Sequence, residues 1–426
     1  MVAIKSIKLD LRSLILFILI SCIPFQNFIL NQSSLGIFGT NLSMPIFYLL
    51  FSYYTIKNIK KLKVNKSQVF FIGYILLITL LFLLFSDFQV KGVNLVIKAI
   101  NNMLIYSQPF IVFYIFNKFF KEREYILISI KVCFFIFIFL LSILILTKLN
   151  ILNLDDIAIF NGIPNHNMRP RLFSMESSHA VTVFITFGMI SLLGSESKIY
   201  RIVIYIMLCL GIFLLQSKSG ILLFFIISIF LFNKLKFQVK LILVLFMSIL
   251  FYQYMQENFS LYFNNILLGF EEYTSFTTRT TLILAGILSL FIYPLGTGFG
   301  AYISLFDNSI QNSMELMNSI FIIIGLIPNF SEVETYLIEA NNYSTKSLFF
   351  DFIMYFGVFG LLFFYKFHKT IYNNINNNII LFFFIFLTLN HTFFVDSVYL
   401  YNFWFGFAFI YNYWRLSSEK YINIGK

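Results

Sequence analysis

The sequence predicts an all-α protein that crosses a membrane about twelve times. Of its 426 residues, 59% are hydrophobic and only 12% are charged, too few charges to cover a water-soluble protein of this length. Apolar stretches of about twenty residues recur along the whole chain, and an α-helix of that length crosses the hydrocarbon core of a bilayer. We therefore expect a single integral membrane domain over residues 1–426.

Each predicted span is an apolar run that ends at polar or basic loop residues. The spans are placed near 12–30, 37–56, 67–86, 94–117, 125–147, 178–194, 199–216, 219–233, 239–256, 347–365, 378–395 and 399–415. The segments 280–296 and 314–328 are also apolar, which leaves a fourteen-span chain open. We expect these two segments to lie in or near the membrane interface.

The basic residues predict the orientation. They gather in short loops, at Lys57, Lys60, Lys61, Lys63 and Lys66, at Lys118, Lys121 and Arg123, and at Lys234, Lys236 and Lys240. Such loops face the cytoplasm, so both termini are expected inside. Of the 30 Lys and Arg residues, 21 fall on that side, eight face outward and Lys131 lies within the fifth span. This distribution explains the net charge of +11 without a nucleic-acid partner.

Two outward-facing loops are long, near 148–177 and 257–346, and the second is the one candidate for an extramembrane subdomain. The sequence contains no Walker loop and no Rossmann fingerprint. The three cysteines, Cys22, Cys133 and Cys209, lie in apolar segments and indicate neither a disulfide framework nor a metal site. No cofactor is expected.

Outward-facing basic residues run against the topology rule and need an explanation. These residues are Lys91, Lys98, Lys148, Arg169, Arg171, Lys218, Arg279 and Lys346. Three of them, Lys218, Arg279 and Lys346, are expected at or just before a helix start, where a cation is disfavoured by roughly 0.3–1 kcal/mol. Several such cations on one face indicate that an anion binds among them, since helix starts and cations together bind phosphate well.

The stretch before the sixth span has the same character. A proline biases Arg169 toward an extended conformation, in which Arg169 and Arg171 point the same way. If the helix begins after Ser174, Glu176 and His179 lie three positions apart on one helix face. Two cations and two titratable groups are then expected at the outer mouth of this span.

Purely structural roles compete with this interpretation. Either arginine can pair with Glu176 or with the acidic pair Asp155 and Asp156. His179 can be a hydrogen-bonded histidine at the interface, and Lys218 can extend its ammonium group to lipid headgroups.

Four stretches together resemble the O-antigen and capsule polysaccharide polymerases of the Wzy family, within the O-antigen polymerase and ligase superfamily. They are RPRLFSMESSHA (169–180), SKSG (217–220), TTRTTLILAGILSLFIYPLGTGFGAY (277–302) and TKSLFFDFIMYFGVFGLL (345–362). They occur in the family's order and cover roughly half of the chain.

The resemblance implies a metal-independent, GT-C-like glycosyltransferase in the bacterial inner membrane. Its donor and acceptor are undecaprenyl diphosphate-linked repeat units on the periplasmic face. Membrane lipids and a chain-length regulator are its further implied partners. The residues expected to hold diphosphate are Arg169, Arg171, Lys218, Arg279 and Lys346. Glu176 is the first choice for the general base and His179 the second, while the large outer loop is expected to bind the sugars.

Two alternatives remain open. An O-antigen ligase uses the same donor, but ligases of this superfamily carry a histidine late in the large loop. Here no histidine lies between His179 and His368. A lipid-linked oligosaccharide flippase is expected to place charges deep in many spans, whereas here the notable charges gather at one face.

Overall fold

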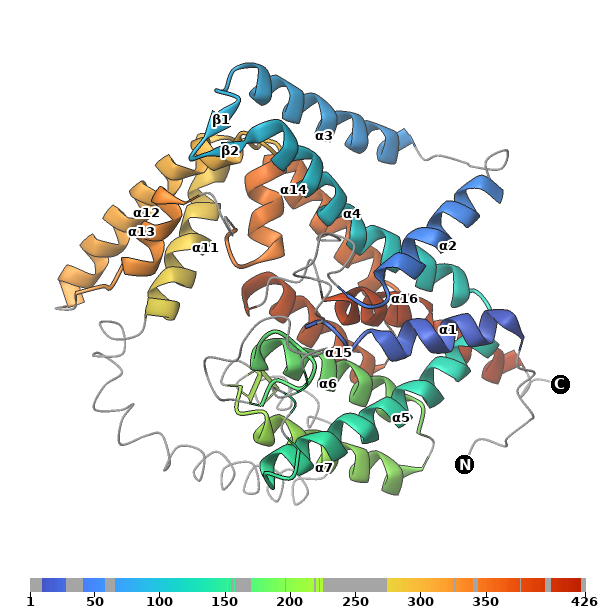
Figure 1. Ribbon diagram of the computed structural model, residues 1–426. Coiled ribbons are helices and arrows are strands. Elements are labelled where there is room, and N and C mark those ends of the chain that lie inside the picture. Colours follow the sequence, from blue (N-terminus) through green and yellow to red (C-terminus); the bar gives the residue numbers. More distant parts are fainter. Residues whose placement is uncertain are drawn as a thin grey trace.

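The computed structural model of the chain is built almost entirely of α-helices (Figure 1). It describes residues 10–27, 41–57, 66–152, 154, 157, 170–195, 197–217, 220–221, 223–224, 274–324, 327–339, 344–375, 377–394 and 400–422. The predicted span at 239–256, most of that at 219–233, and the residues Arg169 and Lys218 lie outside this part of the chain.

In the described residues before position 218, seven helices follow the first seven predicted spans in order. They are α1 (Leu11–Cys22), α2 (Met44–Lys57), α3 (Lys66–Leu84), α4 (Leu95–Phe119), α5 (Arg123–Lys148), α6 (Ser177–Leu193) and α7 (Lys198–Leu214). An antiparallel hairpin of β1 (Gln89–Val90) and β2 (Val93–Asn94) joins α3 to α4. The Asn94 side chain then caps α4, because it accepts hydrogen bonds from two backbone N–H groups of the first turn.

The C-terminal part of the described chain contains a second set of helices. They are α11 (Thr274–Ile292), α12 (Tyr302–Ile324), α13 (Ser331–Ile338), α14 (Leu348–Tyr372), α15 (Asn378–Leu389) with a π-helical turn (Asn390–Phe394), and α16 (Tyr401–Ile422). The helices α14, α15 and α16 occupy predicted spans, whereas α11, α12 and α13 lie within the predicted large loop. Figure 1 shows these three grouped at one side of the molecule, where α11 packs on α14.

The helices identify an all-α membrane protein. By length and composition, α4, α5 and α14 are long and apolar enough to cross a bilayer, and several shorter described helices are also apolar. The α3 helix leaves Ile72, Leu77, Leu80 and Leu84 more than half exposed. A surface of this kind is unfavourable in water and suits contact with lipid chains. The number of twelve spans and their orientation stay predictions.

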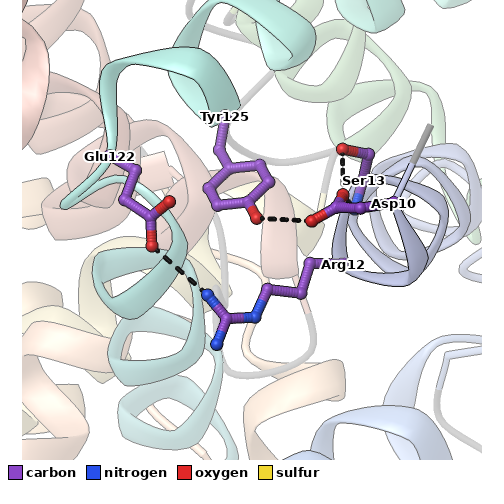
Figure 2. Close-up of polar contacts among 5 residues, drawn as sticks. All are labelled: Asp10, Arg12, Ser13, Glu122 and Tyr125. Carbon is purple, nitrogen blue, oxygen red and sulfur yellow. Dashed lines mark hydrogen bonds and ion pairs between the residues drawn. The ribbon is translucent and has the colours of Figure 1, made fainter. Parts of the chain in front are cut away.

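The start of α1 lies beside the turn between α4 and α5 (Figure 2). Arg12 forms an ion pair with Glu122 at 3.3 Å, and the Tyr125 hydroxyl donates to the Asp10 carboxylate at 3.1 Å. Hydrogen bonds from the Ser13 hydroxyl and backbone N–H, with a smaller one from Tyr125, lower the pKa of Asp10. The two chain segments that these contacts join are both expected to be cytoplasmic.

Further contacts join the ends of α4 and α6 to the middle of α16. Asn412, halfway along α16, donates to Asn117 near the end of α4 at 2.9 Å. The hydroxyl of Tyr413 donates to the carbonyl of Leu193, the last residue of α6, at 3.1 Å. The ends of α4 and α6 therefore both lie beside the middle of α16.

The α14 helix is interrupted where a single span was expected near 347–365. Gly357 has φ 55° and ψ −134°, which is not helical. In a straight helix Phe349 and Phe364 would lie about 22 Å apart along the axis, from a rise of about 1.5 Å per residue. Their ring centroids are 5.4 Å apart, so the second half of α14 folds back toward the first. Glycine adopts this backbone conformation without a steric cost, unlike other residues.

The chain between α11 and α12 fills this interruption. The Val358 N–H donates to the Pro294 carbonyl at 2.9 Å. The Gly298 N–H donates to the Tyr355 carbonyl at 3.0 Å. A broken helix leaves backbone groups without helical partners, and the loop after α11 supplies partners for them.

The same loop reaches α3 and α4. The Phe299 N–H donates to the Thr79 hydroxyl at 3.3 Å, and the Phe299 carbonyl accepts from Asn102 at 3.2 Å. Asn102 is seven residues into α4, about 10 Å from its start by the helical rise. The segments 280–296 and 314–328, expected in or near the interface, thus belong to a helical hairpin whose tip lies between α3, α4 and α14.

We predict that Gly357→Ala greatly reduces the yield of folded protein. An added Cβ would lie 2.0 Å from the Pro294 carbonyl oxygen, and the backbone conformation alone costs a non-glycine residue about 1–3 kcal/mol. Fluorescence-detected size exclusion in detergent with a thermal ramp measures the effect. Gly73→Ala in α3 is the control, because nothing lies within 4 Å of its added Cβ. Equal melting temperatures for the two variants would contradict the prediction.

Candidate functional site

The segment before α6 is fixed against the end of α1. The Phe173 carbonyl accepts the backbone N–H groups of Gln26 and Asn27 at 3.0 and 2.9 Å. The helix begins at Ser177 and not directly after Ser174 as expected, so Glu176 occupies the N-cap position. Its side chain makes no cap hydrogen bond and is therefore directed to other groups.

Arg171 is buried at the entrance to this helix. Its side chain is 4% exposed, and its Nη1 donates to the Met175 carbonyl at 3.3 Å. A buried guanidinium group keeps its charge, because arginine stays protonated in proteins. It therefore adds a fixed positive charge to the chain segment that leads into Glu176.

Glu176 is the point at which several predicted site residues meet. The Glu176 side chain reaches the surface. Surrounding protein atoms nevertheless remove part of its contact with water, and this partial burial is the largest single influence on its pKa, which it raises. The positive charges of His179, Arg279 and Lys346, together with a hydrogen bond from Ser178, outweigh burial and lower the pKa below its ordinary value. An accessible carboxylate in a crowded setting, with cations nearby, has the character of a binding site.

The basic residues that act on Glu176 come from three different parts of the chain. His179 lies in the first turn of α6, Arg279 in α11, and Lys346 in the turn before α14. All four residues were expected at one site, and in the structure the charges of His179, Arg279 and Lys346 act on Glu176.

Arg279 lies deeper in its helix than expected. It was predicted at the start of a helix, but α11 begins at Thr274. The argument from an unfavourable helix dipole therefore does not apply to Arg279. The preceding residue, Thr278, donates its hydroxyl to Glu332 of α13 at 3.0 Å, so the position of this turn is set by packing on α13.

Lys346 sits in a tight turn just before α14, as predicted. Its backbone is left-handed, with φ 60°, and its N–H donates to the Ser344 hydroxyl at 3.1 Å. Its ammonium group lies 5.4 Å from the ring centroid of Tyr336 in α13. The contact with α13 and the electrostatic influence on Glu176 place Lys346 between α13 and α6.

Asp351 is a residue of this region that the sequence analysis missed. It lies in the first turn of α14, is fully buried, and accepts hydrogen bonds from Ser344, Thr345 and Tyr106. The signal was present in the sequence, because Asp351 is a lone acidic residue within an apolar run, and such residues are often functional.

The first and last residues of the SKSG stretch, Ser217 and Gly220, are described. The Cβ of an alanine at Gly220 would lie 2.4 Å from the Val181 side chain, so Gly220 packs directly against α6. Ser217 is buried beside it and accepts a hydrogen bond from the Gly220 N–H at 3.4 Å. The predicted roles of Lys218 and Arg169 fall on residues that lie outside the described part of the chain.

Another basic residue that was predicted to face outward has a structural explanation. Lys91, in the turn of the β-hairpin, forms an ion pair with Asp307 of α12 at 2.8 Å and donates to the Tyr336 carbonyl at 3.0 Å. It ties the hairpin to α12 and α13. Among the described residues, no group of three or more His, Cys, Asp and Glu side chains forms a candidate metal site.

Comparison with known proteins gives a partial likeness. The chain is similar to a Klebsiella pneumoniae protein described as an uncharacterized 49.5 kDa protein in cps region. The two are 30% identical over 236 residues, which is 52% of each chain, so this chain spans about half the length of the relative it matches. No protein-family model and no solved structure matches it. Similarity over half of each chain does not assign a family.

We predict that Glu176→Gln makes thermal stability less sensitive to acid. A carboxylate whose pKa is lowered stabilises the folded state above its ordinary pKa of 4.5, and this contribution disappears as the pH falls through its folded pKa. Melting temperatures measured between about pH 6 and about pH 3 should therefore fall less for Glu176→Gln than for wild type. The control is Glu334→Gln, which changes an exposed carboxylate of α13. A slope unchanged from wild type would show that the cations do not act on Glu176.

Proposed function

We propose that this protein is a polysaccharide polymerase that joins undecaprenyl diphosphate-linked repeat units at the periplasmic face of the bacterial inner membrane. The observation that carries the proposal is the meeting of His179, Arg279 and Lys346, from three elements, around the accessible carboxylate of Glu176. A transferase that expels a diphosphate needs fixed positive charge where negative charge develops, and it needs a base beside it.

Two other observations support this assignment. The Klebsiella pneumoniae relative comes from a cps region, a name that denotes capsule polysaccharide genes. The chain itself is an all-α membrane protein, which suits a transferase whose substrates are linked to membrane lipids. The four sequence stretches that resemble Wzy polymerases include the residues that meet at Glu176.

The donor diphosphate is assigned to the basic residues of the site. Arg279 and Lys346 approach from two elements and Arg171 reinforces the positive charge at the start of α6. Cations that are already fixed before the reaction stabilise a developing phosphate charge without reorganising. Arg169 and Lys218 are proposed as additional contacts from the flanking stretches.

The proposed reaction is a single transfer of a sugar chain. A hydroxyl oxygen of the acceptor repeat unit attacks the anomeric carbon of the donor, forming the new glycosidic bond. The bond between that carbon and the diphosphate oxygen breaks, and undecaprenyl diphosphate leaves with the electron pair. Glu176 accepts the proton of the attacking hydroxyl, and His179 is the second candidate for this role.

Donor binding would also tune this base. In the unliganded protein the surrounding cations lower the pKa of Glu176, which keeps it ionised but makes it a weak base. A bound diphosphate offsets the positive charge of Arg279 and Lys346. The pKa of Glu176 then rises, and the carboxylate becomes a stronger base only once the donor is in place.

An apolar hollow next to this segment offers a path for the lipid chain of the donor. It has a volume of about 250 Å³ and lies between α1 and α5, lined by Phe17, Phe25, Phe135 and Phe139 among others. Phe173, two residues after Arg171, packs on Phe25 with ring centroids 4.6 Å apart. A polyprenyl chain in the hollow would therefore emerge at the segment that carries Arg171 and Glu176.

We predict that Arg171→Ala, Arg279→Ala and Glu176→Ala each abolish chain extension without preventing membrane insertion. Each change removes a charge from the proposed site, so the donor is held or activated poorly. Surface polysaccharide from complemented cells, separated by size on gels, measures extension, and membrane fractionation measures insertion. Lys148→Ala is the matched control, because this outward lysine is exposed at the end of α5. Full activity in all three variants would show that the proposed site does not carry out the reaction.

Deleting the gene separates the polymerase from its alternatives. We expect cells whose lipid A-core carries single repeat units, because export and ligation continue without polymerisation. Uncapped core with polymer retained on its lipid carrier would instead indicate a ligase. Repeat units trapped on the cytoplasmic side would indicate a flippase.

A further inference from the structure

Asp351 is the centre of a dense hydrogen-bond network at the start of α14. Its Oδ1 accepts from the N–H and hydroxyl of Thr345, both at 2.7 Å. Its Oδ2 accepts from the hydroxyls of Tyr106 at 2.8 Å and Ser344 at 3.0 Å. The residue has no exposed surface. Both carboxylate oxygens are therefore fully used, and three of the four donors belong to the two residues before Lys346.

This network determines the shape of the turn that presents Lys346. The lysine backbone is in the left-handed region with φ 60°, which costs free energy in a residue other than glycine. A second anchor holds the far side of the turn, where the Ser347 hydroxyl donates to the Thr392 carbonyl of the π-helical turn at 2.5 Å. Strain of this kind persists only where the surrounding contacts over-determine the conformation.

Capping alone does not explain a buried carboxylate here. The Ser347 side chain already occupies the N-cap position of α14 and accepts from the Phe350 N–H. Burying an ionised group is costly unless several donors compensate it. The compensating donors come from the Lys346 turn and from Tyr106 of α4, so Asp351 connects this turn to the interior of the bundle.

We propose that Asp351 is a positioning residue that holds the 344–347 turn and thereby keeps the Lys346 ammonium group beside the Tyr336 ring of α13, at the place proposed for the donor diphosphate. The role of the diphosphate rests on the proposed function, whereas the placement of Lys346 by Asp351 does not. Asp351 itself is buried and does not touch the substrate.

The reactivity of Lys346 tests the placement without any ligand. Full-length protein in detergent is treated with an amine-acylating reagent, and mass spectrometry follows the modification rate of each lysine. We expect Asp351→Asn to change the rate at Lys346 at least threefold while the rate at Lys148 stays constant. An unchanged rate at Lys346 in folded Asp351→Asn protein would overturn the proposal.

Two further variants separate positioning from a general loss of packing. Thr345→Val removes a hydroxyl of the turn that lies 2.7 Å from the Asp351 carboxylate and 2.8 Å from the Ser347 carbonyl, whereas Tyr106→Phe removes one that reaches the carboxylate from α4 at 2.8 Å. Positioning predicts that Thr345→Val alters Lys346 reactivity and Tyr106→Phe does not. Equal effects of the two variants would overturn the proposal. If Asp351→Asn does not fold, the comparison of Thr345→Val with Tyr106→Phe still tests the positioning role of Asp351.

Binding of farnesyl diphosphate, with farnesol as the uncharged control, tests the consequence for the donor. We expect Asp351→Asn and Lys346→Ala each to weaken diphosphate binding about tenfold, and the double variant to be no weaker than Lys346→Ala alone. Additive losses would mean that Asp351 does not act through Lys346. If wild type binds farnesyl diphosphate no better than farnesol, the proposed function is wrong. The reactivity of Lys346 still tests whether Asp351 positions Lys346.

Discussion

The architecture depends on one requirement, that backbone groups inside a membrane protein find hydrogen-bond partners within the protein. The interruption of α14 at Gly357 would leave several such groups unsatisfied. The loop that follows α11 supplies the partners, through Pro294 and Gly298. The close approach of these two segments ties α11 to α14. Because α11 carries Arg279 and the start of α14 follows Lys346, the same contact determines where two cations of the site lie.

Two opposing effects determine the ionisation of Glu176, namely its burial and the positive charges around it. Burial favours the protonated form of Glu176, but the cations around it favour the ionised form and prevail. Several like charges close together repel one another, and in a crowded environment solvent screens this repulsion weakly. The basic residues can lie close together only when negative charge lies among them. Glu176 supplies part of this negative charge, and a bound anion with several charges would supply more.

The sequence was informative about the helices and about the membership of the site. Long apolar runs predicted α4, α5, α6 and α7 to within a few residues, because each run ends at basic or polar residues. The expected outward placement grouped Arg279 and Lys346 with the Glu176 segment, and in the structure both residues lower the pKa of Glu176. The prediction that Arg279 lies at a helix start was wrong, since Arg279 is five residues into α11, next to the hydrogen bond that joins Thr278 to Glu332 of α13.

Other features could not be predicted from local patterns. Glycine is common in membrane helices, so nothing near Gly357 distinguishes an interruption from a tolerated glycine. The interruption becomes favourable only through contact with residues some sixty positions earlier. Asp351 was not predicted for a different reason, because a lone carboxylate within an apolar run does not reveal that its hydrogen-bond donors lie in the turn before α14 and in α4.

The mutual dependence of the α11–α12 loop and the broken α14 also constrains biogenesis. The hairpin emerges from the ribosome before α14 has been synthesised, so its tip cannot complete its hydrogen bonds at that stage. Until the later helix arrives, the backbone groups at the tip need water or another polar partner. The hydrogen bonds of the C-terminal half are therefore completed only after both segments have been synthesised.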